Sequence, residues 1–285
     1  MADAASSRSA TAERLTRLIL SAAKYRALDE SVVRRAADNA AGRFSDERQA
    51  LKYAKRKLHQ SYGSFLVGSP AQAVTAMAAA VRSGQAGLRQ AALRAMRAHA
   101  SSAERADWLE PFYARVAAWC GAPASVADLG CGLNPLAIPW MTLAPGAAYL
   151  ATEIDTALVA ALAGLGDVMG VRLAAAAMDL LAPQPVIGAD LVFMLKLVTT
   201  LDQQEAGASG RLLRAVDARH VVLSLPRGSL SGRRGYRNEP GAIVGDVVAG
   251  SRYRVAAEAA FGDEAVYYLA EASSAASSAT RQTTS

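Results

Sequence analysis

The sequence has few of the residues that form cross-links or metal sites, and no segment that could span a membrane. Its 285 residues include 2 cysteines, too few for a disulfide framework and without the partners of a zinc site. We therefore expect Cys120 and Cys131 to be small buried residues in a reducing compartment, and we predict no metal. No apolar run approaches the roughly 18 residues of a membrane span, and the first residues lack the apolar core of a signal peptide. We expect a cytoplasmic protein with no membrane partner.

Acidic residues are scarce in the first third of the chain. Residues 1–105 hold 18 Lys and Arg against 8 Asp and Glu, whereas residues 106–285 hold 13 against 17, which gives the net charge of +6. A basic segment before a slightly acidic remainder suggests a separate unit for a polyanion. The alternative is a set of solvated helix faces that happen to be rich in arginine.

Residues 1–100 predict a basic helical domain. Apolar residues recur at helical spacing in 11–28 and 30–41, and Ser45 followed by two acidic residues indicates a further helix start. Helices also fit 70–82, 86–98 and about 102–120. The helix that starts near residue 46 carries five basic residues: Arg48, Lys52, Lys55, Arg56 and Lys57.

From residue 101 short apolar runs alternate with helical stretches. The candidate strands are 125–129, 148–152, 171–175, 190–195, 219–225, 252–258 and 265–270. This alternation predicts an α/β domain with a mostly parallel, Rossmann-like sheet that helices cover on both faces. Only about six residues separate the last two strands, so we expect a hairpin and one antiparallel edge. We assign 101–272 to this domain and predict a disordered tail over 273–285.

The strand that ends at Leu129 runs into a tight glycine turn, Gly130-Cys131-Gly132. A third glycine for a dinucleotide pyrophosphate is missing. Glu153 follows the next strand at the place where an acid takes two ribose hydroxyls. With Asp128 in the first strand and Asp179 after the third, the pattern favours S-adenosylmethionine, with Asp179 beside the adenine. A purely structural doubly wound domain is the alternative.

The glycine turn continues into Asn134-Pro135. Asn134 suits a helix cap and Pro135 suits the first helical turn. The alternative is that Asn134 also orients the target base or the methionine end of the cofactor.

Five segments share their motifs with one known family. They are Asp128–Ala137 with Pro139-Trp140, His99–Arg105, Leu58–Phe65, Ser224–Arg233, and Leu195-Lys196 with Gln203-Gln204. Together they resemble the aminoglycoside-resistance 16S rRNA methyltransferases, which methylate N7 of the guanine at nucleotide 1405 in the decoding site. The resemblance spans roughly residues 12–270 and is greatest to the branch of antibiotic-producing actinomycetes, where the enzyme protects the producer.

The resemblance implies a class I S-adenosylmethionine-dependent methyltransferase domain behind an N-terminal helical RNA-binding extension. Arg105 would pair with the methionine carboxylate, because a guanidinium matches a carboxylate bidentately. Glu153 replaces the family's usual Asp. Gly130 stands where relatives often carry Ala, a change that we expect the backbone to tolerate. The cofactor would be lined by Phe65, His99, Ala100, Ser101, Ser102, Ala103, Glu104, Arg105, Gly130, Glu153, Asp179, Leu180, Leu195 and Gln203.

The implied reaction needs no general base, because N7 of guanine is an unprotonated acceptor and in-line placement of the reactants lowers the barrier. We therefore read His99 as a structural or cofactor-side residue. Lys196 and Arg233 are candidates for holding the target nucleotide, and Asn134 completes our set of catalytic candidates. Arg227 and Arg234, in a Gly/Ser-rich loop, join the five basic helical residues as candidates for RNA contact. The alternative for the loop is simple solvation.

The expected partner is 16S rRNA within the assembled 30S subunit, with no DNA, and we expect a monomer. One alternative is a small-molecule methyltransferase of an antibiotic pathway, although such a substrate would not require the basic unit. The other is a non-catalytic RNA-binding ribosome-assembly factor that would bind 30S subunits without binding S-adenosylmethionine.

Overall fold

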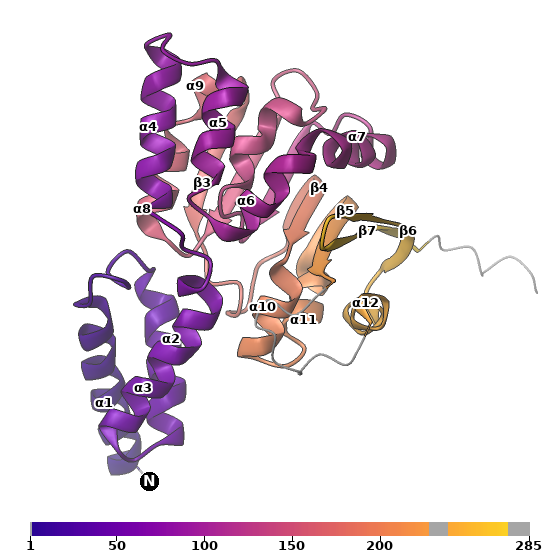
Figure 1. Cartoon of the computed structure of the whole chain (residues 1–285). Coiled ribbons are helices and arrows are strands. Elements are labelled where there is room, and N and C mark those ends of the chain that lie inside the picture. Colours follow the sequence, from indigo (N-terminus) through magenta and orange to yellow (C-terminus); the bar gives the residue numbers. More distant parts are fainter. Residues whose placement is uncertain (1, 228–238, 273–285) are drawn as a thin grey trace, which may run out of the picture.

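A seven-stranded sheet forms the centre of the molecule (Figure 1). The computed structural model describes residues 2–227 and 239–272. The seven predicted strands are confirmed, with ends that differ by at most three residues. In chain order they are β1 (Ser125–Leu129), β2 (Ala148–Glu153), β3 (Arg172–Ala177), β4 (Ile187–Leu195), β5 (Val216–Pro226), β6 (Tyr253–Phe261) and β7 (Glu264–Glu271).

The strand order is β3-β2-β1-β4-β5-β7-β6. The strands from β3 to β5 pair in parallel, and β7 is antiparallel to both of its neighbours. The predicted hairpin at the sheet edge is therefore confirmed, with a turn of only Gly262-Asp263 between its strands. The order reverses between β1 and β4, so a crevice is expected at the carboxyl ends of these strands.

Helices cover both faces of the sheet, as predicted for a Rossmann-like class I fold. One face packs against α4 (Pro70–Arg82), α5 (Leu88–Met96), α7 (Leu109–Cys120), α8 (Thr156–Ala163) and α9 (Gly166–Met169). The other face packs against α10 (Leu197–Gln204), α11 (Ala208–Ala215) and α12 (Pro240–Val248). None of the helices in the described ranges is long and apolar enough to cross a membrane.

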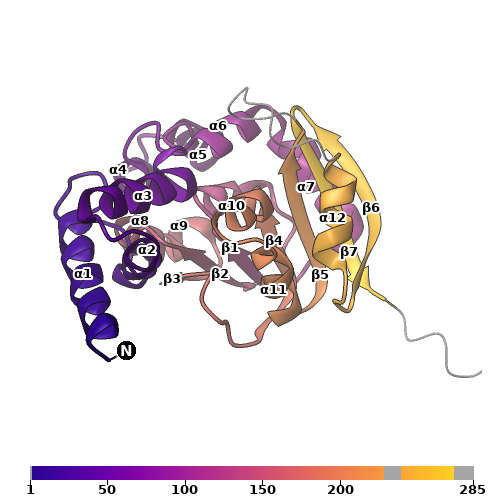
Figure 2. The ribbon, with the colours of Figure 1, turned by 90° about the horizontal axis from the view of Figure 1, so that it is seen from below.

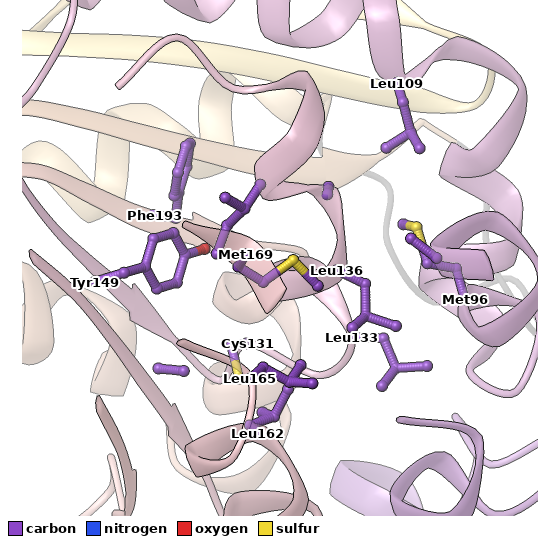
Figure 3. Close-up of a cluster of buried hydrophobic side chains, with 14 of the residues drawn as sticks. Met96, Leu109, Cys131, Leu133, Leu136, Tyr149, Leu162, Leu165, Met169 and Phe193 are labelled. Atoms are coloured by element: carbon purple, nitrogen blue, oxygen red, sulfur yellow. The ribbon is translucent and has the colours of Figure 1, made fainter. Parts of the chain in front are cut away.

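The core on the first face joins residues from distant parts of the chain. Figure 3 shows Tyr149 of β2 and Phe193 of β4 among Leu162, Leu165 and Met169. Each of these side chains is buried, and burying a side chain of this size stabilises the fold by about 1.5–3 kcal/mol.

A third, smaller core belongs to a helical unit formed by α1 (Ala2–Leu20), α2 (Glu30–Arg43) and α3 (Glu47–Leu58). Asp46 caps α3, because its side chain accepts the Gln49 backbone N–H at 2.8 Å. The unit stands at the β3 end of the sheet, far from β6 in both views (Figures 1 and 2). Helices α4 and α5 pack with the sheet instead, so the domain boundary at residue 100 stays a prediction that this packing does not favour.

One predicted helix, over about 102–120, is wrong as a single element. The chain forms α6 (Ala100–Arg105), a 3-10 turn (Ala106–Trp108) and then α7. Pro111 explains the restart, because proline lacks an N–H and is tolerated only in the first turn of a helix. α7 begins two residues before Pro111, which places the proline in the first turn of the helix. The N–H groups of this turn have no partner within the helix, so no helical hydrogen bond is lost.

Candidate cofactor pocket and active site

One pocket collects nine of the residues predicted for the cofactor or for catalysis. It opens where β1, β2 and β4 end and holds about 920 Å³ of space, including its open mouth. This is the position at which sheets of this kind bind their ligands. The nine residues are Phe65, His99, Ser101, Gly130, Glu153, Asp179, Leu180, Leu195 and Lys196.

Six other predicted cofactor residues lie outside the lining of the pocket: Ala100, Ser102, Ala103, Glu104, Arg105 and Gln203. Five of them belong to α6. The sixth, Gln203, is exposed, and its carbonyl accepts Lys57 Nζ at 2.6 Å; its neighbour Gln204 lines the pocket in its place. Contact of these six residues with a cofactor stays a prediction.

The glycine turn is tied to the acid at the end of β2. Glu153 Oε2 accepts the Gly132 N–H at 2.9 Å, and Oε1 accepts the Ile154 N–H at 2.8 Å. Burial raises the pKa of Glu153, and these two backbone donors oppose the shift. The longer Glu side chain thus bridges the glycine turn and β2 while it lines the pocket. A carboxylate so placed fits a ribose diol.

Gly130 adopts a left-handed backbone conformation with φ 61°. A Cβ atom at this position would lie 2.9 Å from Leu197 Cδ1. Our expectation that the backbone would easily tolerate alanine here is therefore wrong for this chain, because left-handed φ is unfavourable for residues with a Cβ.

Asp179 is held by a residue that the sequence did not single out. Arg35 of α2 forms two bonds with it, Nε to Oδ2 at 2.6 Å and Nη2 to Oδ1 at 3.0 Å. Both residues line the pocket. No motif marks Arg35, since one arginine among the many of a basic helical segment carries no distinguishing signal.

The helical unit meets the pocket at a second place. Tyr62, in the π-helical turn His59–Gly63, donates its hydroxyl to Asp155 Oδ2 at 2.7 Å. Asp155 Oδ1 also caps α8 by accepting the N–H groups of Ala157 and Leu158. Tyr62 lies in a segment that resembles the family, yet its partner Asp155 could not be inferred from spacing alone.

Lys196 occupies a strained position at the end of β4. With φ 54° it is the one residue other than glycine with positive φ in the parts of the chain that the structure describes. Strain of this kind is concentrated at functional sites. Its Nζ pairs with Glu104 Oε2 and lies 3.6 Å from Glu264 Oε2. Lys196 lines the pocket, as its predicted catalytic place requires.

Arg105 lies behind the pocket, 3% exposed, and donates Nη2 to Glu264 Oε1 at 2.6 Å. The same oxygen accepts the Ser224 hydroxyl. Glu264 was not predicted as a site residue, because an acidic residue at the start of an apolar strand usually indicates a solvent-exposed strand end. Its carboxylate is nevertheless buried between Arg105 and Lys196.

Asn134 joins this buried network and does not act as a helix cap. It is the first residue of the 3-10 turn η3 (Asn134–Trp140), and the cap position before it is Leu133. Its Nδ2 donates to Asp128 Oδ2 at 3.0 Å, while Oδ1 accepts from Tyr113 at 2.5 Å and from Arg105 at 3.2 Å. The cap prediction is wrong, because these buried partners take both ends of the amide.

Asp128 is buried in the same network and also accepts the Tyr149 hydroxyl at 2.7 Å. Burial raises the pKa of Asp128 to about 6, although the hydrogen bonds from Asn134 and Tyr149 and the charge of Arg105 oppose this. Asp128 does not line the pocket. It links β1 to Asn134, after the glycine turn, and to Tyr149 of β2.

His99 stacks on Phe65, with ring centroids 5.7 Å apart, and its Nδ1 lies 3.0 Å from the Ser101 hydroxyl. Burial, helped by the charges of Arg105 and Lys196, lowers the pKa of His99 to about 4. The ring is therefore neutral at physiological pH. This agrees with a structural or cofactor-side role.

Four of the five predicted basic residues of α3 are free to face solvent or a partner. Arg48, Lys52 and Arg56 are exposed and Lys55 is half-buried. Lys57 instead donates to the carbonyl of Gln203 in α10. Arg227 is exposed at the end of β5, whereas Arg233 and Arg234 lie outside the described residues.

Comparison with known proteins identifies relatives over most of the chain. A model of the family described as ribosomal RNA methyltransferase (FmrO) matches residues 21–243. A 16S rRNA (guanine(1405)-N(7))-methyltransferase of Micromonospora olivasterospora is 53% identical over 256 residues, which cover 88% of this chain and 85% of that protein. The structure of the 16S rRNA methyltransferase RmtF in complex with S-adenosyl-L-homocysteine aligns with TM-score 0.78 and 27% identity, over 92% of this chain and 98% of that one. The chain belongs to the FmrO family of ribosomal RNA methyltransferases.

Proposed function

We propose that the protein transfers a methyl group from S-adenosylmethionine to N7 of guanine 1405 of 16S rRNA, within the 30S subunit. The observation that carries this proposal is the pocket at the β1/β4 switch point, in a chain 53% identical to an enzyme named for this reaction. The RmtF relative was crystallised with S-adenosyl-L-homocysteine, which is what remains of the cofactor after the methyl group has left.

The residues of the pocket fit this cofactor. We assign Glu153 to the ribose hydroxyls and Asp179 to the adenine, and Ile154, Met178 and Leu180 line the same pocket with apolar side chains. When bound, the cofactor supplies an electrophilic methyl group on a sulfonium. Arg105 Nη2 donates to Glu264. If Arg105 also pairs with the methionine carboxylate, as we predict, its guanidinium must bind both carboxylates.

The protein's own task is placement. N7 of guanine carries a lone pair and no proton, so no side chain has to remove one. Lys196 is fixed by its backbone and by the carboxylates of Glu104 and Glu264, and we assign it to the target nucleotide or its phosphate. Holding two reactants in line contributes several kcal/mol to the lowering of the barrier.

The target base must leave its helix to reach the pocket, at a cost of a few kcal/mol. The basic helical unit beside the pocket is suited to offset this cost through contacts with rRNA phosphates. Methylation places a positive charge on the base and removes its acceptor. A cationic drug bound against that edge would then lose a hydrogen bond and meet repulsion, which is a physical route to aminoglycoside resistance.

Two variants test the assignment of Lys196 to the target nucleotide and of Glu153 to the cofactor. Lys196→Ala should lose most methyl transfer to 30S subunits while it binds S-adenosyl-L-homocysteine nearly as the wild type does, because we assign the lysine amine to the target nucleotide and not to the cofactor. Glu153→Gln should weaken binding of that ligand. Isothermal titration and transfer of labelled methyl groups measure the two effects. Full transfer by Lys196→Ala would remove this residue from the mechanism.

A second experiment separates the proposed function from its alternatives. Labelled S-adenosylmethionine is offered with 30S subunits, with protein-free 16S rRNA and with no RNA. We expect label in the 30S subunits, and much less in free rRNA, because a folded surface is recognised. Binding to 30S subunits without any binding of the cofactor would favour a silent assembly factor instead.

A further inference from the structure

The basic helical unit contributes directly to the wall of the cofactor pocket. Val32 and Arg35 lie one turn apart on α2, and both line the pocket. Tyr62 and Phe65, which follow α3, line it as well. The unit that carries the basic surface is thus also a part of the small-molecule site.

Arg35 fixes the carboxylate of Asp179 in one orientation. Its planar guanidinium reaches both oxygens, at 2.6 and 3.0 Å, and Oδ1 also accepts the Leu181 N–H at 3.1 Å. The Asp179 side chain is 7% exposed and that of Arg35 is 28% exposed. An ionised carboxylate offers about four acceptor positions and no donor, so Oδ2 keeps one acceptor position beyond its bond to Arg35.

We propose that Arg35 is a positioning residue for the cofactor, holding Asp179 so that its carboxylate accepts the exocyclic amino group of the adenine ring. This inference rests on the proposed function, which assigns the pocket to S-adenosylmethionine. A carboxylate held as an acceptor selects a 6-amino purine over a 6-oxo purine, since the latter presents an acceptor at the same place and leaves the remaining acceptor position of Asp179 Oδ2 without a donor.

Attachment of the helical unit to the sheet does not depend on Arg35 alone. The Asp29 N–H bonds to the Ile154 carbonyl at 2.8 Å, Leu28 forms a bridge with Asp155, and Tyr62 bonds to Asp155. The Thr156 N–H and hydroxyl both bond to the Ala27 carbonyl. Removal of Arg35 should therefore leave the unit in place and change the pocket.

The test is isothermal titration of the full chain with S-adenosylhomocysteine and with its 6-oxo analogue, S-inosylhomocysteine. Arg35→Gln removes the bidentate pair, and Arg34→Gln, at an exposed neighbouring position on α2, is the matched control because it removes the same charge. We expect wild type and Arg34→Gln to prefer the 6-amino ligand. In Arg35→Gln the affinity for that ligand should fall about tenfold, as for a lost charge-assisted contact, and the preference should shrink.

A purely structural role would weaken both ligands equally, and that result would overturn the proposal, as would unchanged affinity in Arg35→Gln. Arg35→Lys is the second variant: it keeps the charge but lacks the planar fork, so it too should lose preference, and full preference would contradict the proposal. Asp179→Asn and Glu153→Gln distinguish a failure of the pocket assignment from a failure of the role of Arg35. If both leave binding unchanged, the assigned pocket fails; if both weaken it and Arg35→Gln does not, only the role of Arg35 fails.

Discussion

Glu264 faces two cations from within the protein, with Arg105 on one oxygen and Lys196 3.6 Å from the other. Its side chain is 1% exposed. Two buried atoms of this pair have no hydrogen-bond partner, Arg105 Nε and Glu264 Oε2. The pair is therefore incompletely satisfied, and its members depend on each other's charge.

Replacing Glu264 with glutamine should destabilise the protein strongly. The change keeps the shape of the side chain but leaves Arg105 buried without its counter-charge, which costs about 3–5 kcal/mol. Unfolding in urea measures the loss. Glu271→Gln is the control on the same strand, where the side chain is 55% exposed and the effect should stay within about 0.5 kcal/mol. Equal effects of the two substitutions would contradict the account.

His99 predicts a pH dependence of stability. Its folded pKa of about 4 lies below the usual 6.5, so between these values the unfolded chain binds more protons. His99 should therefore lower the free energy of unfolding as pH drops through this window, and its own contribution is about 2 kcal/mol between pH 7 and pH 5. Asp128, with its pKa raised to about 6, opposes this trend in part.

The contribution of His99 is isolated by comparison with His99→Gln. Unfolding in urea at pH 7 and pH 5 gives the change for each protein. The wild type should lose about 2 kcal/mol more than the variant over this range. An equal loss in the two proteins would mean that the pKa of His99 is not lowered in the folded state.

At the scale of elements, the strands were predictable because each is a short apolar run between turn residues. The breaks between helices were less so. The predicted helix over 102–120 is interrupted at Ala106–Trp108, shortly before Pro111. Apolar periodicity alone does not reveal this break, because it takes no account of the missing N–H of proline. Asn134 failed as a cap because a cap is a local motif, whereas its buried partners Asp128 and Tyr113 come from other elements.

The junction of β4 and α10 stores strain that glycine would relieve. Lys196 has φ 54°, which costs a residue with a Cβ about 1–2 kcal/mol. Lys196→Gly should therefore be about 1 kcal/mol more stable than Lys196→Ala, although both lack the amine and should be poor in methyl transfer. Denaturant unfolding compares the pair, and an alanine variant as stable as the glycine variant would show that the junction is unstrained.

At the scale of the molecule, the resemblance located the pocket and nine of its lining residues, but not the groups that hold them. Arg35 and Glu264 act over 144 and 159 residues of sequence separation, where spacing carries no signal. The basic surface could be predicted as a whole from charge, whereas the attachment of Lys57 to α10 depends on the docking of the helical unit against the sheet.

The exposed face of α3 should set the salt dependence of 30S binding. Lys52→Glu with Lys55→Glu should weaken binding and lower the magnitude of the slope of log affinity against log salt by about 1.4–1.8, because each lost phosphate contact removes roughly 0.7–0.9. Lys57 is left unchanged because it bonds to Gln203. Arg115→Glu with Arg254→Glu is the control with the same change in charge, at exposed positions on α7 and β6, far from α3 (Figure 2). Equal slopes for the two double variants would contradict a specific role for α3.

Mapping the methyl group on the rRNA is the most direct test of the proposed reaction. 30S subunits treated with the protein and S-adenosylmethionine are digested, and mass spectrometry with primer extension after chemical cleavage at 7-methylguanosine locates the modification. We predict one added methyl group, on N7 of guanine 1405, and none in subunits treated with the cofactor alone. A methyl group on another atom or another nucleotide, or no methyl group on the rRNA, would contradict this prediction.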